Sequence, residues 1–260
     1  MAADPAAETS ATKATAAKSP SSGAVGYWAE SRRPLSSLAF VAPMLVAYEL
    51  GVVVLGQQAT RNGVDVCLRG LLDLLGFGQY FLLPALTVGI LLAWHHTTAQ
   101  AWRIRARALY GMSLESMALG FVLLVVANAQ AALFAPTASI HLSASAAPAG
   151  EVAGRLVGYL GAGTYEELLF RLMLLPVVAA IARAAGATPR VSLATAVVLT
   201  SLVFSAAHYE IFTTHGDAFQ WYSFVFRFVA GVFFSLLFVW RGFGVAVGTH
   251  ACYDVLAVLS

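Results

Sequence analysis

The sequence predicts an all-α membrane protein, a polytopic bundle of about seven transmembrane helices with an intramembrane active site. Hydrophobic residues make up 59% of its 260 residues and charged residues only 11%, against about 25% charged in soluble domains. Apolar runs of about 20 residues, enough to cross a bilayer, recur along the chain. After residue 150, charged side chains stand inside these runs. A charge inside a span is expensive, so its default interpretation is a functional site.

The first 150 residues are predicted to form transmembrane helices without motifs, over 27–150, behind a tail. Residues 1–26 are rich in Ala, Ser, Thr and Pro, which predicts a disordered N-terminal tail. Residues 57–73 mix Arg and Asp with leucines, which predicts a loop with a short amphipathic helix at the membrane surface. The predicted spans of this half are about 35–56, 79–96 and 114–135.

The second half contains four further apolar segments, at about 153–185, 191–209, 219–240 and 243–260. Pro176 is expected to kink or divide the first of them. With a cytoplasmic N-terminus, most arginines of the loops fall on the inner side, as the positive-inside rule requires. This orientation gives seven spans and an outer C-terminus.

The stretch 164–171 places two carboxylates and one guanidinium inside an apolar segment. On a helix, Glu167 and Arg171 lie four residues apart on one face, and Glu166 is turned by about 100° from Glu167. Arg171 can therefore hold Glu167 while Glu166 points elsewhere. A buried ion pair that only fixes packing would explain one of the carboxylates and leave the other unbalanced.

Two further pairs follow on later helices. Phe204 and His208 lie four residues apart where a span ends, and His250 and Asp254 have the same spacing in the last span. Taken alone, each histidine is better explained by a structural hydrogen bond. His208 also falls near the outer end of its span, which is shallow for a partner of Glu166.

Together the three motifs, Glu166-Glu167-x-x-x-Arg171, Phe204-x-x-x-His208 and His250-x-x-x-Asp254, resemble the CPBP family of intramembrane proteases. That family includes CAAX prenyl endopeptidases and bacterial abortive-infection and bacteriocin-immunity proteins. The resemblance covers about 153–260 and implies that 151–260 forms a CPBP-like catalytic helix bundle. The implied reaction is hydrolysis of a peptide bond within the membrane by an activated water.

The resemblance also implies a role for each motif residue. Glu166 would be the general base, with His208 helping to hold the water, while His250 and Asp254 would polarise the scissile carbonyl. Position 254 is Asp where the family admits Asn or Asp, so it either donates or only accepts a hydrogen bond. The candidate catalytic residues are Glu166, Glu167, His208, His250 and Asp254, and the supporting residues are Arg171 and Phe204.

Two alternatives for a metal cofactor stay open. Glu166, His208 and His250 could supply three zinc ligands, with water in the fourth position. The sequence has no His-Glu-x-x-His motif, and one glutamate does not easily serve as both a tight ligand and a base. A zinc enzyme and a metal-free, glutamate-activated water are therefore equal alternatives.

The predicted partners are a membrane protein or peptide substrate and the lipid bilayer. A net charge of +2, with scattered basic residues, does not predict nucleic-acid binding. Two other functions compete: a catalytically silent immunity or scaffold protein of the same fold, and a proton-coupled transporter. The transporter is disfavoured because the buried charges gather in one half of the chain. The Ala-rich tail and compact length favour a multi-pass protein of a bacterial cell membrane.

Overall fold

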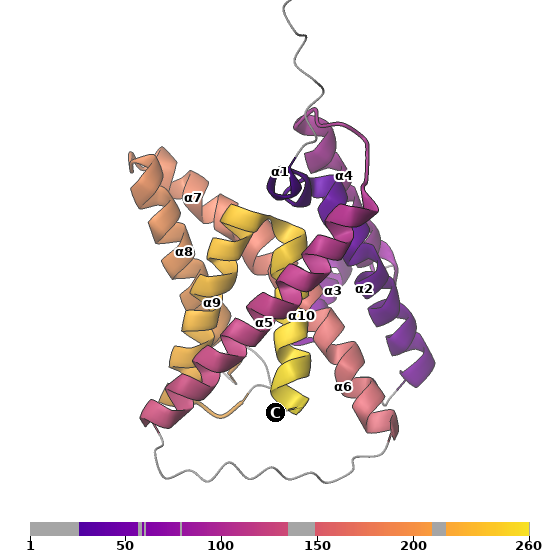
Figure 1. Cartoon of the computed structure of the whole chain (residues 1–260), viewed down its shortest axis with the longest axis vertical. Helices are drawn as coiled ribbons and strands as arrows, with labels where there is room; N and C mark the ends of the chain where they lie inside the picture. Colours follow the sequence, from indigo (N-terminus) through magenta and orange to yellow (C-terminus); the bar gives the residue numbers. More distant parts are fainter. Residues whose placement is uncertain are drawn as a thin grey trace, which may run out of the picture.

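The computed structural model describes residues 26–56, 59, 61–78, 80–134, 149–209 and 217–259, which form a bundle of helices (Figure 1). Residues 1–25 of the predicted tail and residues 135–148 lie outside the described residues. The helices in chain order are α1 (Tyr27–Ser31), α2 (Pro34–Leu55), α3 (Gly63–Leu74), α4 (Leu82–Thr97), α5 (Ala106–Phe134), α6 (Ala149–Gly161), the π-helical turns η2 (Ala162–Glu166) and η3 (Leu168–Leu174), α7 (Leu175–Ala184), α8 (Pro189–Ala206), α9 (Trp221–Arg241) and α10 (Phe243–Leu259).

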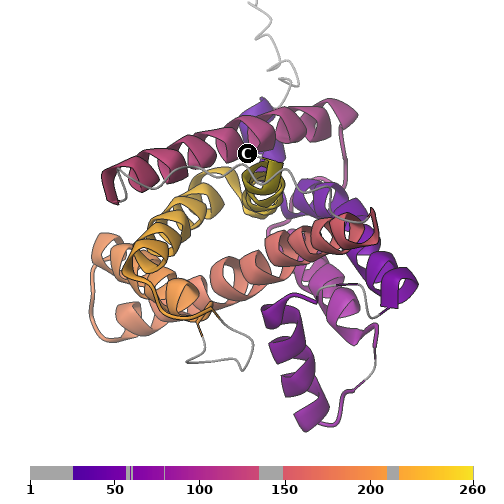
Figure 2. The ribbon, with the colours of Figure 1, turned by 90° about the horizontal axis from the view of Figure 1, so that it is seen from below.

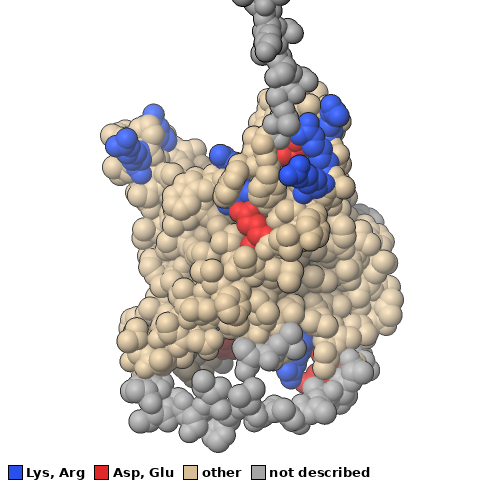
Figure 3. Space-filling view, viewed as in Figure 1, with Lys and Arg blue, Asp and Glu red and all other residues tan. Residues whose placement is uncertain are grey.

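The predicted helical membrane bundle is confirmed. Among the described residues, four helices are long and apolar enough to cross a membrane, namely α2, α5, α8 and α9, while α4 and α10 are apolar but shorter. The count of seven spans therefore stays a prediction. On the face shown in Figure 3, charged side chains lie at the upper and lower ends, one charged patch lies just above the middle, and the belt below that patch is uncharged. Such a belt is what the hydrocarbon core of a bilayer requires.

Helix α10 lies at the centre of the bundle, in contact with α5, α9, α2 and η2 (Figures 1 and 2). Its residues from Phe243 to Ala251 are buried. Small residues on its neighbours make this possible, because a side chain at Gly120 of α5 would place Cβ 3.1 Å from the backbone nitrogen of Tyr253. A Cβ at Gly163 of η2 would lie 3.0 Å from the carbonyl oxygen of Val247. These approaches bring α10 against η2, where the acidic pair lies.

The segment from α6 to α7 runs obliquely through the bundle as one continuous helical path (Figure 2). Pro176 lies in the first turn of α7, where its missing N–H is tolerated best. The wide turns η2 and η3 directly precede it. Pro176 thus marks the change from wide turns to regular α-helix and does not divide the segment, since helical turns continue through it without a break. Wide turns of this kind inside helices are frequent at functional sites.

The last two helices are joined by one residue, Gly242, whose φ is 87°. Glycine adopts this left-handed conformation without strain. A side chain there would also place Cβ 3.2 Å from the Cα of Arg32. The tight link sends α10 straight back along α9, so that His250 lies deep in the bundle.

Candidate active site

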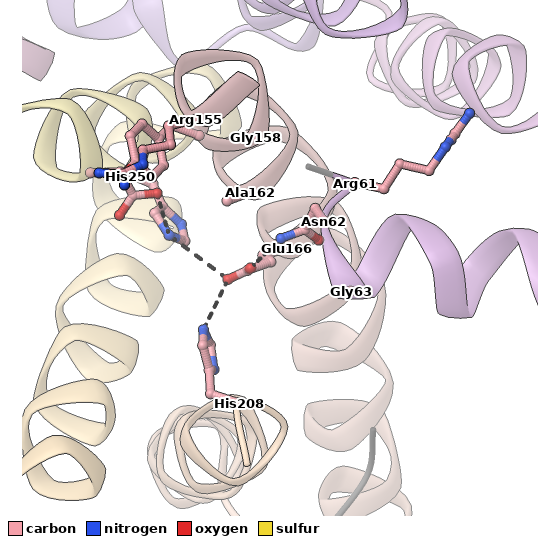
Figure 4. Close-up of a pocket in the computed structure, with 11 residues that line it drawn as sticks. Arg61, Asn62, Gly63, Arg155, Gly158, Ala162, Glu166, His208 and His250 are labelled. Carbon is pink, nitrogen blue, oxygen red and sulfur yellow. Dashed lines mark hydrogen bonds and ion pairs between the residues drawn. The ribbon is translucent and has the colours of Figure 1, made fainter. Parts of the chain in front are cut away.

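A cavity of about 490 Å³ lies where α6, η2, α10, the end of α8 and the start of α3 meet. Its walls include Glu166, His208, His250 and Asp254 from the motifs and Asn62 from the first half of the chain (Figure 4). Predicted site residues from three separate helical segments are thus neighbours. Their catalytic roles stay predictions.

Glu166 lies between the two histidines, as Figure 4 shows. Its Oε2 is 3.7 Å from Nε2 of His208 and 3.8 Å from Nε2 of His250. Within the described part of the chain, this buried oxygen has no hydrogen-bond partner. The gaps exceed a direct hydrogen bond, and a water molecule can bridge polar groups at such separations. Three polar atoms therefore converge on one small volume.

The hydrogen bond made by Nδ1 of His208 determines the tautomer of its ring. Nδ1 lies 2.8 Å from the carbonyl oxygen of Phe204, which can only accept, so Nδ1 carries the hydrogen. In the neutral ring, Nε2 is then a free acceptor that faces Glu166. His208 follows the end of α8 by two residues, and its ring faces the carboxylate of Glu166. A position near the end of its span therefore does not prevent His208 from reaching Glu166.

Glu167 is not part of the cavity wall, and it binds two side chains, Arg171 and His250. Its Oε1 accepts from Nη1 of Arg171 at 3.0 Å and from Nδ1 of His250 at 2.8 Å. Arg171, 1% exposed, also donates to the carbonyl oxygen of Gly231 at 3.2 Å. Glu167 thereby fixes the ring of His250, and Nε2 of that ring faces the cavity.

Phe204 packs between Arg171 and His208. The guanidinium of Arg171 lies 4.3 Å from the centre of its ring, and the ring of His208 lies 4.9 Å away edge-on. On the other side of the cavity, Phe234 stacks on His250 at 4.5 Å and 13°. Aromatic faces of this kind attract the buried cation and keep both imidazoles in place.

Asp254 lies at the edge of the site, its Oδ2 3.7 Å from Nε2 of His250. It also lines a second cavity of about 400 Å³, together with Phe226 and other apolar or aromatic residues of α5, α9 and α10. Arg227 borders this second cavity and pairs with Asp217 at 2.5 Å. The space beside His250 is therefore largely apolar.

The donor set was compared with the needs of a zinc ion. Ligands at about 2.0–2.1 Å in a tetrahedron stand about 3.3 Å apart, whereas Oε2 of Glu166 is 3.7 and 3.8 Å from the two Nε2 atoms. No three His, Cys, Asp or Glu side chains in the described ranges are grouped so that they could hold a metal ion. The geometry of this site therefore does not fit a zinc ion, which was one of the two alternatives left open by the sequence.

Sequence reasoning missed one residue of the site, Asn62, whose Nδ2 donates to Oε1 of Glu166 at 2.7 Å. The order Asn62, Gly63, Val64, Asp65 is a helix-start signal, so the cap was detectable, although its contact with Glu166 was not. The prediction of a short helix at 57–73 is confirmed by α3, but its placement at the surface is wrong for Asp65, which is fully buried.

Comparison with known families found one match. Residues 148–256 match the family described as type II CAAX prenyl endopeptidase, Rce1-like. The comparisons with curated proteins and with solved structures found no match. The matched segment contains all three motifs, so the resemblance inferred from them is confirmed for residues 148–256.

Proposed function

We propose that this protein is an intramembrane endopeptidase that hydrolyses a peptide bond with a water activated by Glu166. One observation carries the proposal: the unpartnered Oε2 of Glu166 and the Nε2 atoms of His208 and His250 converge at 3.7 and 3.8 Å. A water in that gap would be bound by a base and two imidazoles. The family match supports protease activity at the level of the family.

The first chemical step is assigned to Glu166. Its Oε2 takes a proton from the water, and the water oxygen attacks the carbonyl carbon of the scissile bond. His208, a neutral acceptor at Nε2, holds the water in line. The carboxylate and both imidazoles lie close enough to hold one water between them, which is the geometry that general-base catalysis requires.

His250 is assigned to the developing negative charge. In its protonated form it donates Nδ1–H to Glu167 and directs Nε2–H into the cavity, with Asp254 beside it. A preorganised donor at the oxyanion is commonly worth about 3–4 kcal/mol of barrier. As the carbon–nitrogen bond breaks, the leaving amine takes the proton from Glu166, which restores the base and releases two new termini.

The proposed membrane is a bacterial cell membrane and the proposed substrate a membrane protein or a membrane-proximal peptide. The aromatic and aliphatic side chains in the wall of the cavity of about 400 Å³ beside His250 support an apolar segment on one side of the scissile bond. Glu166 is 5% exposed. Bulk water therefore reaches the base only through the polar cavity.

The test uses purified protein in detergent and a library of membrane-proximal peptides, with new termini read by mass spectrometry. Wild-type protein should cleave, and Glu166→Gln should lower the rate by a factor of roughly 10³ or more, because the amide cannot take a proton. Glu151→Gln is the matched control, since Glu151 is exposed and bonds only to Arg155 among the described residues. Cleavage by Glu166→Gln at the wild-type rate would refute its role as the base. Folded wild-type protein that cleaves nothing would instead favour a silent scaffold.

A further inference from the structure

One oxygen of Glu166 accepts a hydrogen bond from a residue outside the segment 148–256 that matches the family. Nδ2 of Asn62 donates to Oε1 at 2.7 Å, on the side opposite the histidines (Figure 4). Asn62 lies in the first half of the chain, 104 residues from Glu166. A carboxylate held at one oxygen cannot rotate freely, so the position of Oε2 is fixed as well.

The orientation of the Asn62 amide is determined by the helix that it caps. Oδ1 accepts from the backbone N–H groups of Val64 at 2.9 Å and Asp65 at 3.4 Å, at the start of α3. These groups only donate, so Oδ1 must face α3 and Nδ2 must face Glu166. One side chain thus caps a helix and aims a donor at the carboxylate.

Helix α3 is itself held by a buried carboxylate. Asp65 is fully buried, and its Oδ2 accepts from Oη of Tyr48 at 2.8 Å and from Nη1 of Arg61 at 2.9 Å. Its Oδ1 accepts from Nε of Arg69 at 2.6 Å. Charge-assisted bonds on both oxygens fix the first turn of α3, and with it Asn62.

The same cluster reaches the helix that carries the base. Oε1 of Glu49 accepts from Nη2 of Arg69 at 2.7 Å and from Oη of Tyr165 at 2.5 Å. Tyr165 directly precedes Glu166. The donor Asn62 and the acceptor Glu166 are therefore tied to one polar network. Apart from Oε2 of Glu166 itself, only Oε2 of Glu49 lacks a hydrogen-bond partner among the described buried side-chain atoms of this network, and the remaining bonds hold the joined elements together.

From this arrangement we infer that Asn62 is a positioning residue, which holds Oε1 of Glu166 so that Oε2 is the oxygen presented to the water. The inference rests on the proposed function in taking Glu166 as the base. A residue that only caps α3 could be replaced equally well by Asp or Ser, since both are good N-caps. A residue that donates to Glu166 could not, because Ser is too short to reach it and Asp would set oxygen against oxygen.

The first test compares wild-type protein with Asn62→Ser and Asn62→Asp. Asn62→Ser should lower kcat by a factor of about 10–100, as for loss of one preorganised contact, with KM and the melting temperature nearly unchanged. Asn62→Asp should be less active still. A pure cap would leave the Asn, Ser and Asp proteins equally active, and that result would overturn the inference. Asn128→Ser in α5, an exposed position, is the matched control and should keep wild-type kcat.

A second readout does not require proteolysis. The infrared spectrum of wild-type protein minus that of Glu166→Gln isolates the carboxylate stretching bands of Glu166. The same subtraction in the Asn62→Ser background should give shifted bands, because a hydrogen bond to one oxygen is lost. Identical bands would overturn the inference, whatever the activity. Shifted bands in a protein that cleaves nothing would uphold the contact and reject the proposed protease.

Discussion

The most direct test of the buried charges is to remove the guanidinium of Arg171. Arg171→Met keeps most of the side-chain volume but deletes the bonds to Glu167 at 3.0 Å and to Gly231 at 3.2 Å, and the contact with Phe204. Glu167, which is fully buried, is left with His250. Removing one partner of a buried ion pair typically costs about 3–5 kcal/mol, so a loss of this size in the free energy of unfolding is expected.

Unfolding in mixed detergent, followed by circular dichroism, measures this loss. Arg183→Met is the matched control, because Arg183 at the exposed end of α7 bonds only to the carbonyl oxygen of Ala187 in the described residues. It should cost less than about 1 kcal/mol. Adding Glu167→Gln to Arg171→Met should recover part of the stability, since no unpaired charge remains. A loss below about 1 kcal/mol for Arg171→Met, or a double variant that is less stable still, would refute the reasoning.

Three further predictions concern the site. Gly163→Ala should lower the free energy of unfolding by about 1–3 kcal/mol and reduce cleavage, because the new Cβ meets the backbone of α10. The control, Gly89→Ala, has open space around it and should change neither quantity in the same unfolding and cleavage assays. His208→Gln should lower kcat by a factor of roughly 10² while the melting temperature stays within a few degrees, since His208 lies beyond the end of α8; an unchanged kcat would contradict its role at the water. Incubation with a strong chelator should leave the cleavage rate within about twofold of its starting value. Loss of cleavage that is reversed by added zinc would show that the donor atoms close around a metal.

The helices themselves were predictable because lipid leaves the backbone few alternatives. An apolar run near 20 residues must satisfy its own hydrogen bonds, so runs such as 35–56 and 191–209 appear as α2 and α8 with ends within a few residues. The wide turns η2 and η3 were not predictable. They depend on how η2 packs against α10 and on the proline that follows, which are tertiary effects rather than properties of the local sequence.

The site was predictable only where its spacing is helical. Glu167 with Arg171 and His250 with Asp254 are i, i+4 pairs, so each pair shares a face of its own helix whatever the rest of the fold does. The contact between Glu167 and His250 is different, because 83 residues separate the two and only the packing of α10 on η2 brings them together. The resemblance to a family predicted that these two residues belong to one site, whereas helical periodicity could not predict it.

The polar cluster around Asp65 shows why the first half of the chain was harder to interpret. Glu49 in an apolar run and two arginines in a short amphipathic helix carry no motif, and the simplest interpretation of such a helix is a solvated surface. Yet both oxygens of a buried carboxylate need hydrogen-bond partners. The motif helices direct two histidines at Oε2 and leave Oε1 open, and Asn62 fills that position at 2.7 Å. The half without motifs thus completes the surroundings of Glu166, and substitutions there can alter the chemistry of the site without touching a motif residue.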